Sequence, residues 1–321
     1  MGSEEAIKLE LKESTPKQEK DEKLRRIVEE NLDKIIALLR KKNYSIIEPS
    51  KSAKKKVEEK PSAKKESETK VIGIAGKGGV GKTTLAALFL RTLLERNSST
   101  ILAVDSDPNL CLPGLLGVED YETLSSMIEK RRGSRLQPRE FQQEFNSLLI
   151  KNEQDGYDLL PMGRGEGQGC YCAVNNLLRS TFRHIILSGN YAYDYVVVDC
   201  EAGLEHVSRK TSSMVDDLII MTDGSRMGLN TVQKIRDVGE KVKIGIDNFY
   251  TVANKIDDEE VLREVQATSQ EFGMTYLGNL PYDREVEKLS FEGKSVFELS
   301  DHSQVYLKGK EIVDRVLSRK P

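Results

Sequence analysis

The stretch GKGGVGKTT at residues 76–84 limits what this 321-residue chain can fold into more than any other feature. It satisfies the phosphate-binding pattern G-x-x-x-x-G-K-[ST], and it stands between the apolar run 71–75 and a helical run that starts at Thr83. Its glycines let the backbone curl until successive N–H groups and a helix N-terminus point at one anion. This order of strand, loop and helix predicts a P-loop nucleotide-binding site rather than a chance glycine turn.

The loop also predicts roles for single side chains. Lys82 is expected to reach the β- and γ-phosphates of a bound nucleotide, and Thr83 is expected to offer its hydroxyl to Mg²⁺. We predict contacts to ATP from every residue of the stretch, namely Gly76, Lys77, Gly78, Gly79, Val80, Gly81, Lys82, Thr83 and Thr84.

From residue 71 onward, short apolar runs alternate with longer amphipathic runs, which is typical of a parallel sheet wrapped by helices. Several of the apolar runs contain almost no polar residue, as expected for strands that helices cover on both faces. We therefore predict an α/β P-loop NTPase domain over residues 71–321, with a mostly parallel sheet of about seven strands. The predicted strands are 71–75, 100–105, 157–161, 195–199, 217–222, 249–254 and 275–280.

Residues 1–70 have a different character. Apolar side chains recur at helical spacing over 22–42, so residues 1–48 are predicted to form an N-terminal extension with one amphipathic helix. Residues 49–70 contain eight lysines, four glutamates and no aromatic residue, which predicts a flexible, disordered linker. The lysine run 54–56 fits a solvated spacer better than a contact with an acidic partner or RNA.

Composition narrows the choice of partners and compartment. A formal net charge of −3 gives no general attraction to nucleic acid. The chain shows no secretory signal and no run of about eighteen apolar residues, so we expect a cytoplasmic protein that does not bind membranes. In that reducing compartment, closely spaced cysteines are ligands or redox groups rather than structural disulfides.

Acidic residues end two of the predicted strands, at the edge of the sheet where such a fold places the phosphates. Asp105 and Asp107 lie at the end of the strand 100–105, and helix capping is an alternative role for either of them. Asp199 closes the strand 195–199, where its carboxylate is expected to hold Mg²⁺ directly or through water.

The second lysine of the loop, Lys77, makes GKGGVGKT resemble the deviant Walker A motif of the MinD/ParA and nitrogenase iron protein superfamily. In that superfamily the extra lysine reaches the nucleotide of a facing protomer, which implies an ATP-held homodimer. A solvent-facing charge is the alternative for Lys77. The resemblance of AVDSDPN to the first switch implies that Asp107 positions or activates the attacking water, with Asp105 nearby in the Mg²⁺ shell. The predicted catalytic residues are Lys77, Lys82 and Asp107.

Three later segments extend this resemblance. The residues after Asp199 resemble the second switch, which changes shape with the γ-phosphate. Asn254 in VANKID resembles the adenine-recognising asparagine of the superfamily, and Pro281 lies in NLPYD, which resembles the loop that covers the base. Together they imply ATP and ADP as ligands rather than guanine nucleotides, since the guanine-specific pattern NKxD is broken. The second-switch residues singled out are Glu201, Gly203, Glu205 and His206.

Cys170 and Cys172 stand one residue apart in the glycine-rich stretch 165–176. In an extended segment, residues i and i+2 face the same side, so both sulfurs can point at one metal ion. A closed tetrahedral site needs four ligands, and a two-fold symmetric dimer would supply the second pair. A strained, redox-active disulfide or two unrelated thiols are the alternatives.

The other two cysteines, Cys111 and Cys200, lack metal-site spacing, and Cys200 is predicted to be a small buried hydrophobe. A soft thiolate site accepts Zn²⁺, Ni²⁺, Cu(I) or an iron–sulfur cluster, and the spacing does not choose among them.

The segments LLPMGRGEGQGCYCAVNNLLRS and YDYVVVDCEAGLEHVSRKT, together with VDSDPN and the P-loop, resemble the CooC family over roughly residues 71–318. That resemblance implies an ATPase that inserts nickel, with Ni²⁺ or Zn²⁺ held between protomers by Cys170 and Cys172, and with carbon monoxide dehydrogenase/acetyl-CoA synthase as the client. A MinD/ParA-type positioning ATPase and an iron–sulfur reductase like the nitrogenase iron protein are the alternatives. The latter takes its cysteine ligands from two separated segments.

Overall fold

The computed structural model describes residues 69–96, 100–130, 138–152, 156–163, 193–200, 215–241 and 246–318, apart from the side chains of 138–142 and 241. Several predictions lie outside these ranges. They concern the extension 1–48 with its helix 22–42, nearly all of the linker 49–70, the second-switch residues 201–206, and the pair Cys170 and Cys172.

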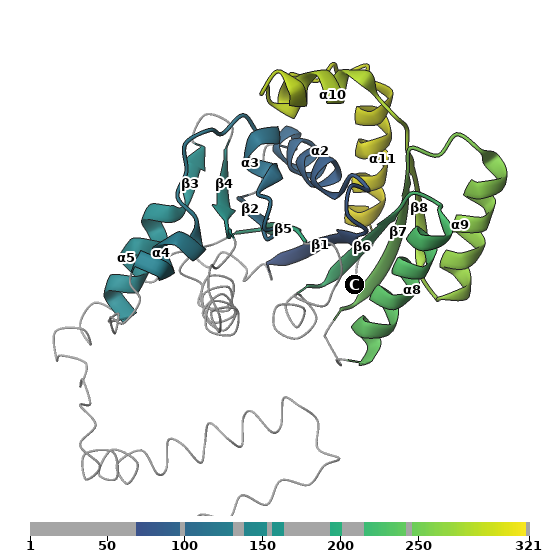
Figure 1. Cartoon of the computed structure of the whole chain (residues 1–321), viewed down its shortest axis with the longest axis horizontal. Helices are drawn as coiled ribbons and strands as arrows, with labels where there is room; N and C mark the ends of the chain where they lie inside the picture. Colours follow the sequence, from purple (N-terminus) through teal and green to yellow (C-terminus); the bar gives the residue numbers. More distant parts are fainter. Residues whose placement is uncertain are drawn as a thin grey trace, which may run out of the picture. The chain divides into compact units, whose positions relative to one another are not determined.

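The described part of the chain contains one sheet of eight strands (Figure 1). Their spatial order is β3-β4-β2-β5-β1-β6-β7-β8, and every neighbouring pair is parallel except β3 with β4. All seven predicted strands are present, so the α/β, mostly parallel prediction is confirmed. The strands are β1 (Lys70–Gly76), β2 (Ile101–Asp105), β3 (Ile150–Asn152), β4 (Tyr157–Pro161), β5 (Tyr195–Asp199), β6 (Asp217–Thr222), β7 (Asn248–Asn254) and β8 (Thr275–Leu280).

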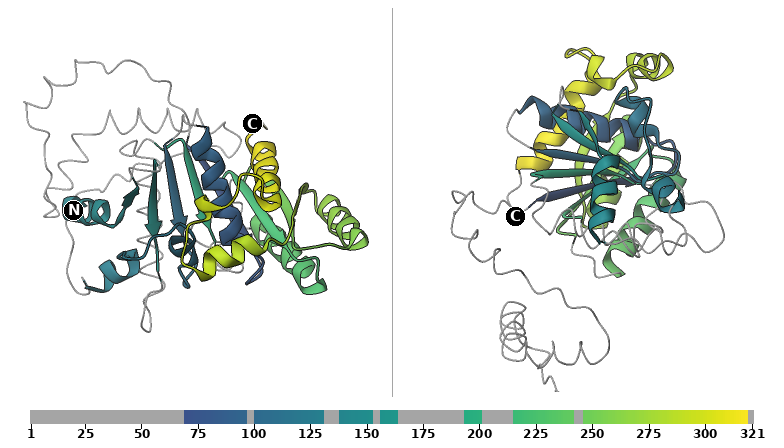
Figure 2. Two further views of the ribbon diagram at one scale, coloured as in Figure 1. Left: turned by 90° about the horizontal axis from the view of Figure 1, so that it is seen from above. Right: turned by 90° about the vertical axis from the view of Figure 1, so that its left-hand side faces the viewer.

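Helices cover both faces of the sheet (Figures 1 and 2). Ile72 and Ile74 of β1 belong to the apolar cluster under α2, α10 and α11, whereas Val71 and Ala75 belong to the cluster under α4, α5 and α8. Burial on both faces explains why the strands read as apolar runs without alternation. The helices are α2 (Lys82–Glu95), α3 (Cys111–Leu115), α4 (Leu124–Lys130), α5 (Pro138–Leu148), α8 (Arg226–Lys241), α9 (Glu259–Glu271), α10 (Arg284–Phe291), the 3₁₀ turn η3 (Val296–Glu298) and α11 (Gln304–Ser318).

Helix α2, which follows the P-loop, is held in place by a buried arginine. The guanidinium of Arg91 donates to the carbonyl oxygen of Leu299 at 2.7 Å, pairs with Asp301 at 2.5 Å and lies 4.0 Å from the ring centroid of Tyr306. A planar guanidinium with five N–H donors suits such a combined hydrogen-bonding and stacking role. These contacts hold α2, the helix that directly follows the P-loop, in place.

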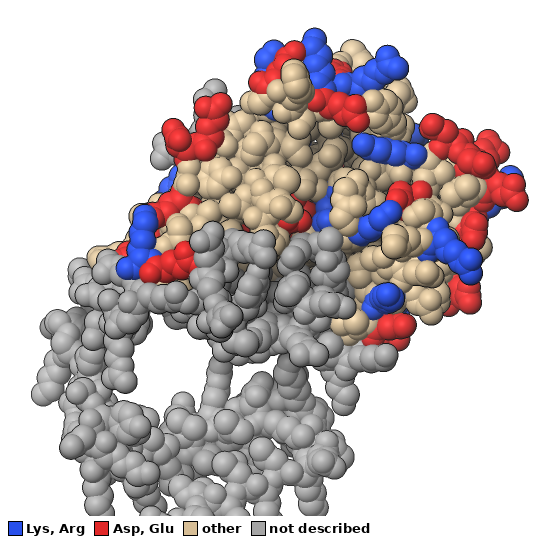
Figure 3. All heavy atoms as spheres, viewed as in Figure 1, with Lys and Arg blue, Asp and Glu red and all other residues tan. Residues whose placement is uncertain are grey.

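Charged side chains of both signs are interspersed over the described part of the face drawn in Figure 3. In the residues that the structure describes, no helix has both the length and the apolar composition needed to cross a bilayer.

Candidate nucleotide-binding site

The P-loop lies at the carboxyl edge of the sheet, where the chain changes direction between strands. From β1 the chain passes through α2 to β2 on one side, whereas β6 pairs with the other side of β1. In an open α/β sheet, connections that leave a strand in opposite directions open a crevice at its carboxyl end, and ligands bind there. This rule predicts that a ligand binds at residues 76–84, the loop that follows β1.

The backbone of the P-loop is shaped by Asn254 at the end of β7. Its Nδ2 donates to the carbonyl oxygen of Val80 at 2.7 Å, and a Cβ at Gly81 would lie 2.4 Å from the same nitrogen. Gly81 also has a φ of 96°, in the left-handed region that favours glycine. Asn254 is thus a buried brace for the loop in this structure, and its predicted contact with adenine stays a prediction.

The two lysines of the loop have different surroundings. Lys82 is only 6% exposed, and its Nζ donates to the carbonyl oxygen of Lys77 at 3.4 Å, which directs it along the inside of the loop. Lys77 points away from this position, and its Nζ pairs with Oδ2 of Asp223 at 3.0 Å. Asp223 is not among the residues predicted from the sequence. It directly follows the apolar strand 217–222, and the same position after a strand is what led to the prediction of Asp105 and Asp199.

Two buried carboxylates face the loop from neighbouring strands. Asp105 of β2 and Asp199 of β5 are direct partners in the parallel register, and both are fully buried. Burial raises the pKa of Asp199 to about 7, and only partial relief comes from the Thr83 hydroxyl and the Lys82 charge. Burial likewise raises the pKa of Asp105 to about 6.

The two carboxylates differ in how their oxygens are used. Oδ1 of Asp105 accepts the backbone N–H of Asp107 at 3.0 Å, and Oδ2 accepts that of Leu112, in the first turn of α3, at 2.9 Å. Asp105 therefore caps the first turn of α3, which is the alternative role named for it above. Its place in a Mg²⁺ shell stays a prediction. Neither oxygen of Asp199 accepts a hydrogen bond of ordinary geometry from any described residue.

A divalent cation fits the surroundings of Asp199. A buried carboxylate without hydrogen bonds is unfavourable unless a positive charge compensates it. Thr83 is close enough for its hydroxyl to lower the pKa of Asp199, and hydroxyl and carboxylate oxygens are ligands that Mg²⁺ accepts. The predicted pair of Mg²⁺ ligands, Thr83 and Asp199, is therefore brought together by the fold.

The pKa of Asp199 predicts how stability depends on pH. Between pH 5 and 7, without Mg²⁺, the folded chain keeps a proton on Asp199 that the unfolded chain has lost, because the folded pKa rises to about 7 from an ordinary 3.8. The free energy of unfolding is therefore expected to fall by about 2 kcal/mol over this range, at about 1.4 kcal/mol per pH unit near pH 5 and about half that slope at pH 7. Urea unfolding in EDTA at both pH values measures the change.

Asp199→Asn is the matched control, since it keeps the shape and removes the titrating group. The variant is expected to show a smaller fall, because Asp105 still titrates, and added Mg²⁺ is expected to reduce the fall in the wild type only. Equal pH dependence in wild type and variant would show that folding does not raise the pKa of Asp199.

Asp107 is half-buried and follows β2 in a tight turn. Its Oδ1 accepts both the backbone N–H and the side-chain amide of Asn109, each at 2.9 Å. Pro281 follows β8 at the same edge of the sheet, two strands away from β6, and it lines a separate hollow of about 400 Å³ between β8 and α11. Asp107 lies close enough to Asp199 for its charge to raise the pKa of that carboxyl group, whereas a contact of Pro281 with a base stays a prediction.

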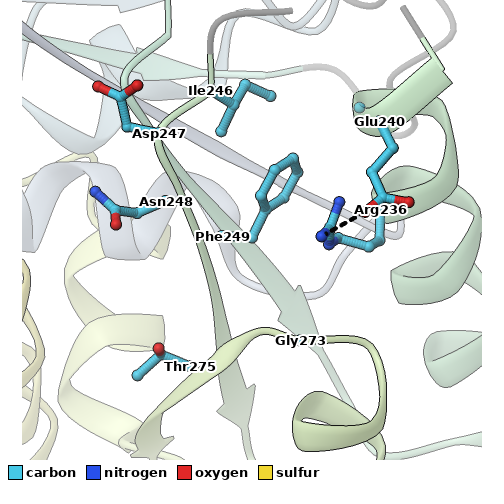
Figure 4. Close-up of a pocket in the computed structure, with 9 residues that line it drawn as sticks. Arg236, Glu240, Ile246, Asp247, Asn248, Phe249, Gly273 and Thr275 are labelled. Atoms are coloured by element: carbon cyan, nitrogen blue, oxygen red, sulfur yellow. Dashed lines mark ion pairs between the residues drawn. The ribbon is translucent and has the colours of Figure 1, made fainter. Parts of the chain in front are cut away.

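A further hollow of about 420 Å³ lies at the opposite edge of the sheet (Figure 4). It opens at the amino ends of β7 and β8, where Arg236 stacks over the ring of Phe249 at 4.1 Å and pairs with Glu240 at 2.7 Å. Ligands of such sheets bind at the carboxyl ends of the strands, so this hollow is not the nucleotide site.

Two cysteines lie among the described residues. Cys200 is fully buried next to Asp199, and burial raises its pKa to about 12, which confirms the prediction of a buried hydrophobe. Cys111 is exposed at the start of α3, and partial burial together with the nearby carboxylates raises its pKa as well. In the part of the chain that the structure describes, no group of three or more His, Cys, Asp or Glu side chains is arranged to hold a metal ion.

Comparisons with known proteins relate this chain to nucleotide-binding proteins. The model of the CobQ/CobB/MinD/ParA nucleotide binding domain matches residues 71–296. An uncharacterized ATP-binding protein of Methanocaldococcus jannaschii is 36% identical over 262 residues, which are 78% of this chain and 99% of that protein. The carbon monoxide dehydrogenase accessory protein CooC of Rhodospirillum rubrum is 29% identical over 245 residues, 71% of this chain and 90% of that protein.

Solved structures show the same fold. The septum site-determining protein MinD of Pyrococcus horikoshii OT3, complexed with Mg-ADP, has a TM-score of 0.59 at 22% identity, covering 77% of this chain and 96% of that one. A ParA family ATPase from Chlorobium tepidum has a TM-score of 0.58 at 23% identity, with coverages of 78% and 98%. At these identities the likeness establishes the α/β P-loop NTPase fold.

Proposed function

Because the chain belongs to the CobQ/CobB/MinD/ParA nucleotide-binding domain family, we propose that it is an ATPase that dimerises on ATP and carries a metal ion for the maturation of a client enzyme. The observation that carries the ATPase assignment is that a preformed P-loop lies close to Asp199, a buried carboxylate that accepts no hydrogen bond of ordinary geometry from the described residues. The client we propose is carbon monoxide dehydrogenase/acetyl-CoA synthase, supported by the identity to CooC.

The proposed chemistry assigns one task to each side chain. The P-loop N–H groups and Lys82 bind the phosphates, and Lys82 stays in place because it is buried inside the loop. Thr83 and Asp199 would hold Mg²⁺, which when bound neutralises phosphate charge. Asp107 orients the attacking water, and the turn to Asn109 fixes its carboxylate.

The proposed metal site lies between two protomers. Cys170 and Cys172 of one chain and the same residues of a second chain would supply four thiolates around Ni²⁺ or Zn²⁺. In this cycle ATP favours the dimer, and hydrolysis releases the metal or the client, because a ligand shifts an equilibrium only through its different affinity for the two states. The metal is cargo, so the site must open as well as close.

A positioning ATPase of the MinD/ParA type is less well supported. The MinD and ParA structures described above share 22% and 23% identity with this chain, which establishes only a common fold. Most apolar residues of helix α11 are packed into the core, and the single exposed Leu307 does not make a free apolar face. The buried ones are Val305, Ile312, Val313 and Val316. Co-sedimentation with liposomes or DNA in the presence of ATP would reveal such an activity.

Lys77→Ala tests the proposed dimer. If each Lys77 reaches the nucleotide of the facing protomer, the symmetric dimer loses two charge-assisted hydrogen bonds of about 1.5–3 kcal/mol each. The dimer is then expected to dissociate about 10²- to 10⁴-fold more readily, while ATP still binds to the protomer through Lys82. Analytical ultracentrifugation with a non-hydrolysable ATP analogue measures the dimer constant.

Lys234→Ala is the control, because Lys234 is an exposed lysine of α8. It is expected to dimerise like the wild type. A Lys77→Ala protein whose ATP-dependent dimer is as tight as that of the wild type would reject the proposed role of Lys77 in trans.

A further inference from the structure

An ion pair between Lys77 and Asp223 joins two strands of the sheet that lie side by side. The partners are 146 residues apart in sequence, and Nζ lies 3.0 Å from Oδ2. Strands β1 and β6 are parallel, with Gly76 opposite Met221, so the chain positions that follow both strands stand next to each other. The fold therefore brings the Asp223 carboxylate to the first turn of the P-loop.

Hydrogen bonds from residues that follow it in the chain orient the Asp223 carboxylate. Its Oδ1 accepts the hydroxyl of Ser225 at 2.6 Å and the backbone N–H of Ser225 at 3.2 Å, which leaves Oδ2 for Lys77. The Ser225 hydroxyl also accepts the backbone N–H of Gly228 at 3.0 Å. A Cβ at Gly228 would lie 2.4 Å from Oδ1 of Asp223, so the first turn of α8 leaves room for this carboxylate only because residue 228 is glycine.

The charge of Asp223 is retained at neutral pH. Partial burial acts to raise the pKa of its carboxyl group, but hydrogen bonds from Ser225 and Lys77 outweigh that effect, so the pKa lies below its ordinary value. Among the residues that the structure describes, Asp223 is the one carboxylate within ion-pair distance of Lys77.

The pair is also easy to break. The side chains of Lys77 and Asp223 are 35% and 36% exposed, and ion pairs in contact with water contribute little free energy. Lys82, by contrast, is buried and cannot leave its place in the loop. Of the two lysines in the loop, Lys77 is the one that can change partners without exposing apolar surface.

We infer that Asp223 is a positioning residue that holds Lys77 within the free protomer and competes for it with the nucleotide phosphates of a facing protomer. This inference rests on the proposed function, because only an ATP-bound dimer offers Lys77 a second partner. In this inference Lys77 swings away from Asp223 to reach the phosphates of the facing protomer. Forming the symmetric dimer therefore breaks two Lys77–Asp223 pairs.

Asp223→Asn is expected to make the ATP-dependent dimer about 2- to 30-fold tighter, the factor for two solvent-exposed ion pairs that no longer have to be broken. Asp223→Glu, which keeps the charge, is expected to lie between the Asn variant and the wild type. Asp257→Asn removes an exposed carboxylate next to the same edge of the sheet, after β7, and is the matched control with an unchanged dimer constant. Sedimentation with a non-hydrolysable ATP analogue measures all four proteins.

A second readout tests the pair without nucleotide or dimer. In nucleotide-free protein, an amine-acylating reagent followed by mass spectrometry is expected to modify Lys77 faster in Asp223→Asn than in the wild type, with buried Lys82 as the internal reference. A purely structural role for Asp223 would lower the urea midpoint without this selective change at Lys77.

The outcomes separate the two proposals. Tighter dimers and faster Lys77 acylation in Asp223→Asn support the competition. A wild type that dimerises with ATP, together with an Asn variant that dimerises equally or more weakly, overturns the inference and leaves the proposed function intact. A wild type that stays monomeric with ATP overturns the proposed function, and the competition with it, even where acylation shows that the pair exists.

Discussion

Replacing Asp107 with asparagine is expected to lower the rate of ATP hydrolysis about 10²- to 10⁴-fold, the usual contribution of a positioned general base. The carboxylate follows β2 and is fixed by the backbone and side chain of Asn109. An asparagine oxygen can still accept these hydrogen bonds, so the turn is expected to keep its shape. What the variant loses is the negative charge that orients the attacking water.

Two measurements isolate this effect. Steady-state phosphate release reports the rate, and titration with a fluorescent ATP analogue is expected to show binding within about threefold of the wild type, because no phosphate ligand has changed. Asp120→Asn, at an exposed aspartate beyond α3, is the control and is expected to hydrolyse ATP normally. A turnover rate of Asp107→Asn close to that of the wild type would remove Asp107 from the proposed mechanism.

Removing Cys170 and Cys172 together is expected to abolish stoichiometric binding of Ni²⁺ or Zn²⁺. Thiolate sites of this kind hold a metal with apparent free energies of about 10–16 kcal/mol, so losing every sulfur ligand leaves no measurable site at micromolar metal. The double alanine variant is expected to keep ATP binding, because it leaves the P-loop residues 76–84 unchanged. Metal analysis after gel filtration measures the change.

Cys111→Ala is the matched control for the cysteine pair. Cys111 is an exposed thiol, but its surroundings raise its pKa, so it is protonated at neutral pH and is a poor metal ligand. The control is expected to bind as much metal as the wild type. Full metal retention in the double variant would show that other residues hold the metal.

The sequence predicted the strands well because burial on both faces gives each of them an apolar run. It missed β3, whose three residues Ile150–Asn152 pair antiparallel with β4 at the edge of the sheet. The strand is too short for a periodic pattern, and none of its three residues is fully buried. Its pairing depends on the neighbouring strand rather than on its own composition.

In the nucleotide site, too, local features could be predicted from the sequence and contacts between distant segments could not. The P-loop and Asp199 could be predicted because each role needs one residue type at one place beside a strand. Contacts between distant segments could not be predicted. Examples are the ion pair of Asp223 with Lys77 and the hydrogen bond from Asn254 to the carbonyl oxygen of Val80. Nothing in the local sequence shows that Asn254 supports the loop, because that role depends on β7 lying one strand beyond β6.

Asp105 illustrates a prediction that sequence left open. Its position at a strand end suited either a Mg²⁺ shell or a helix cap, and the spacing to α3 did not decide between them. In the folded chain both oxygens accept backbone N–H groups, which fixes the turn that carries Asp107. The position of Asp107, the proposed catalytic aspartate, therefore depends on Asp105, a buried residue of strand β2.

Native mass spectrometry of the full chain with a non-hydrolysable ATP analogue and Ni²⁺ tests the shared metal site most directly, because one spectrum counts chains, nucleotides and metal ions. We expect a species of two chains, two nucleotides and a single metal ion, absent without nucleotide and without metal in the Cys170→Ala, Cys172→Ala protein. A single chain that holds its own metal ion, with or without nucleotide, would contradict a site built from two protomers.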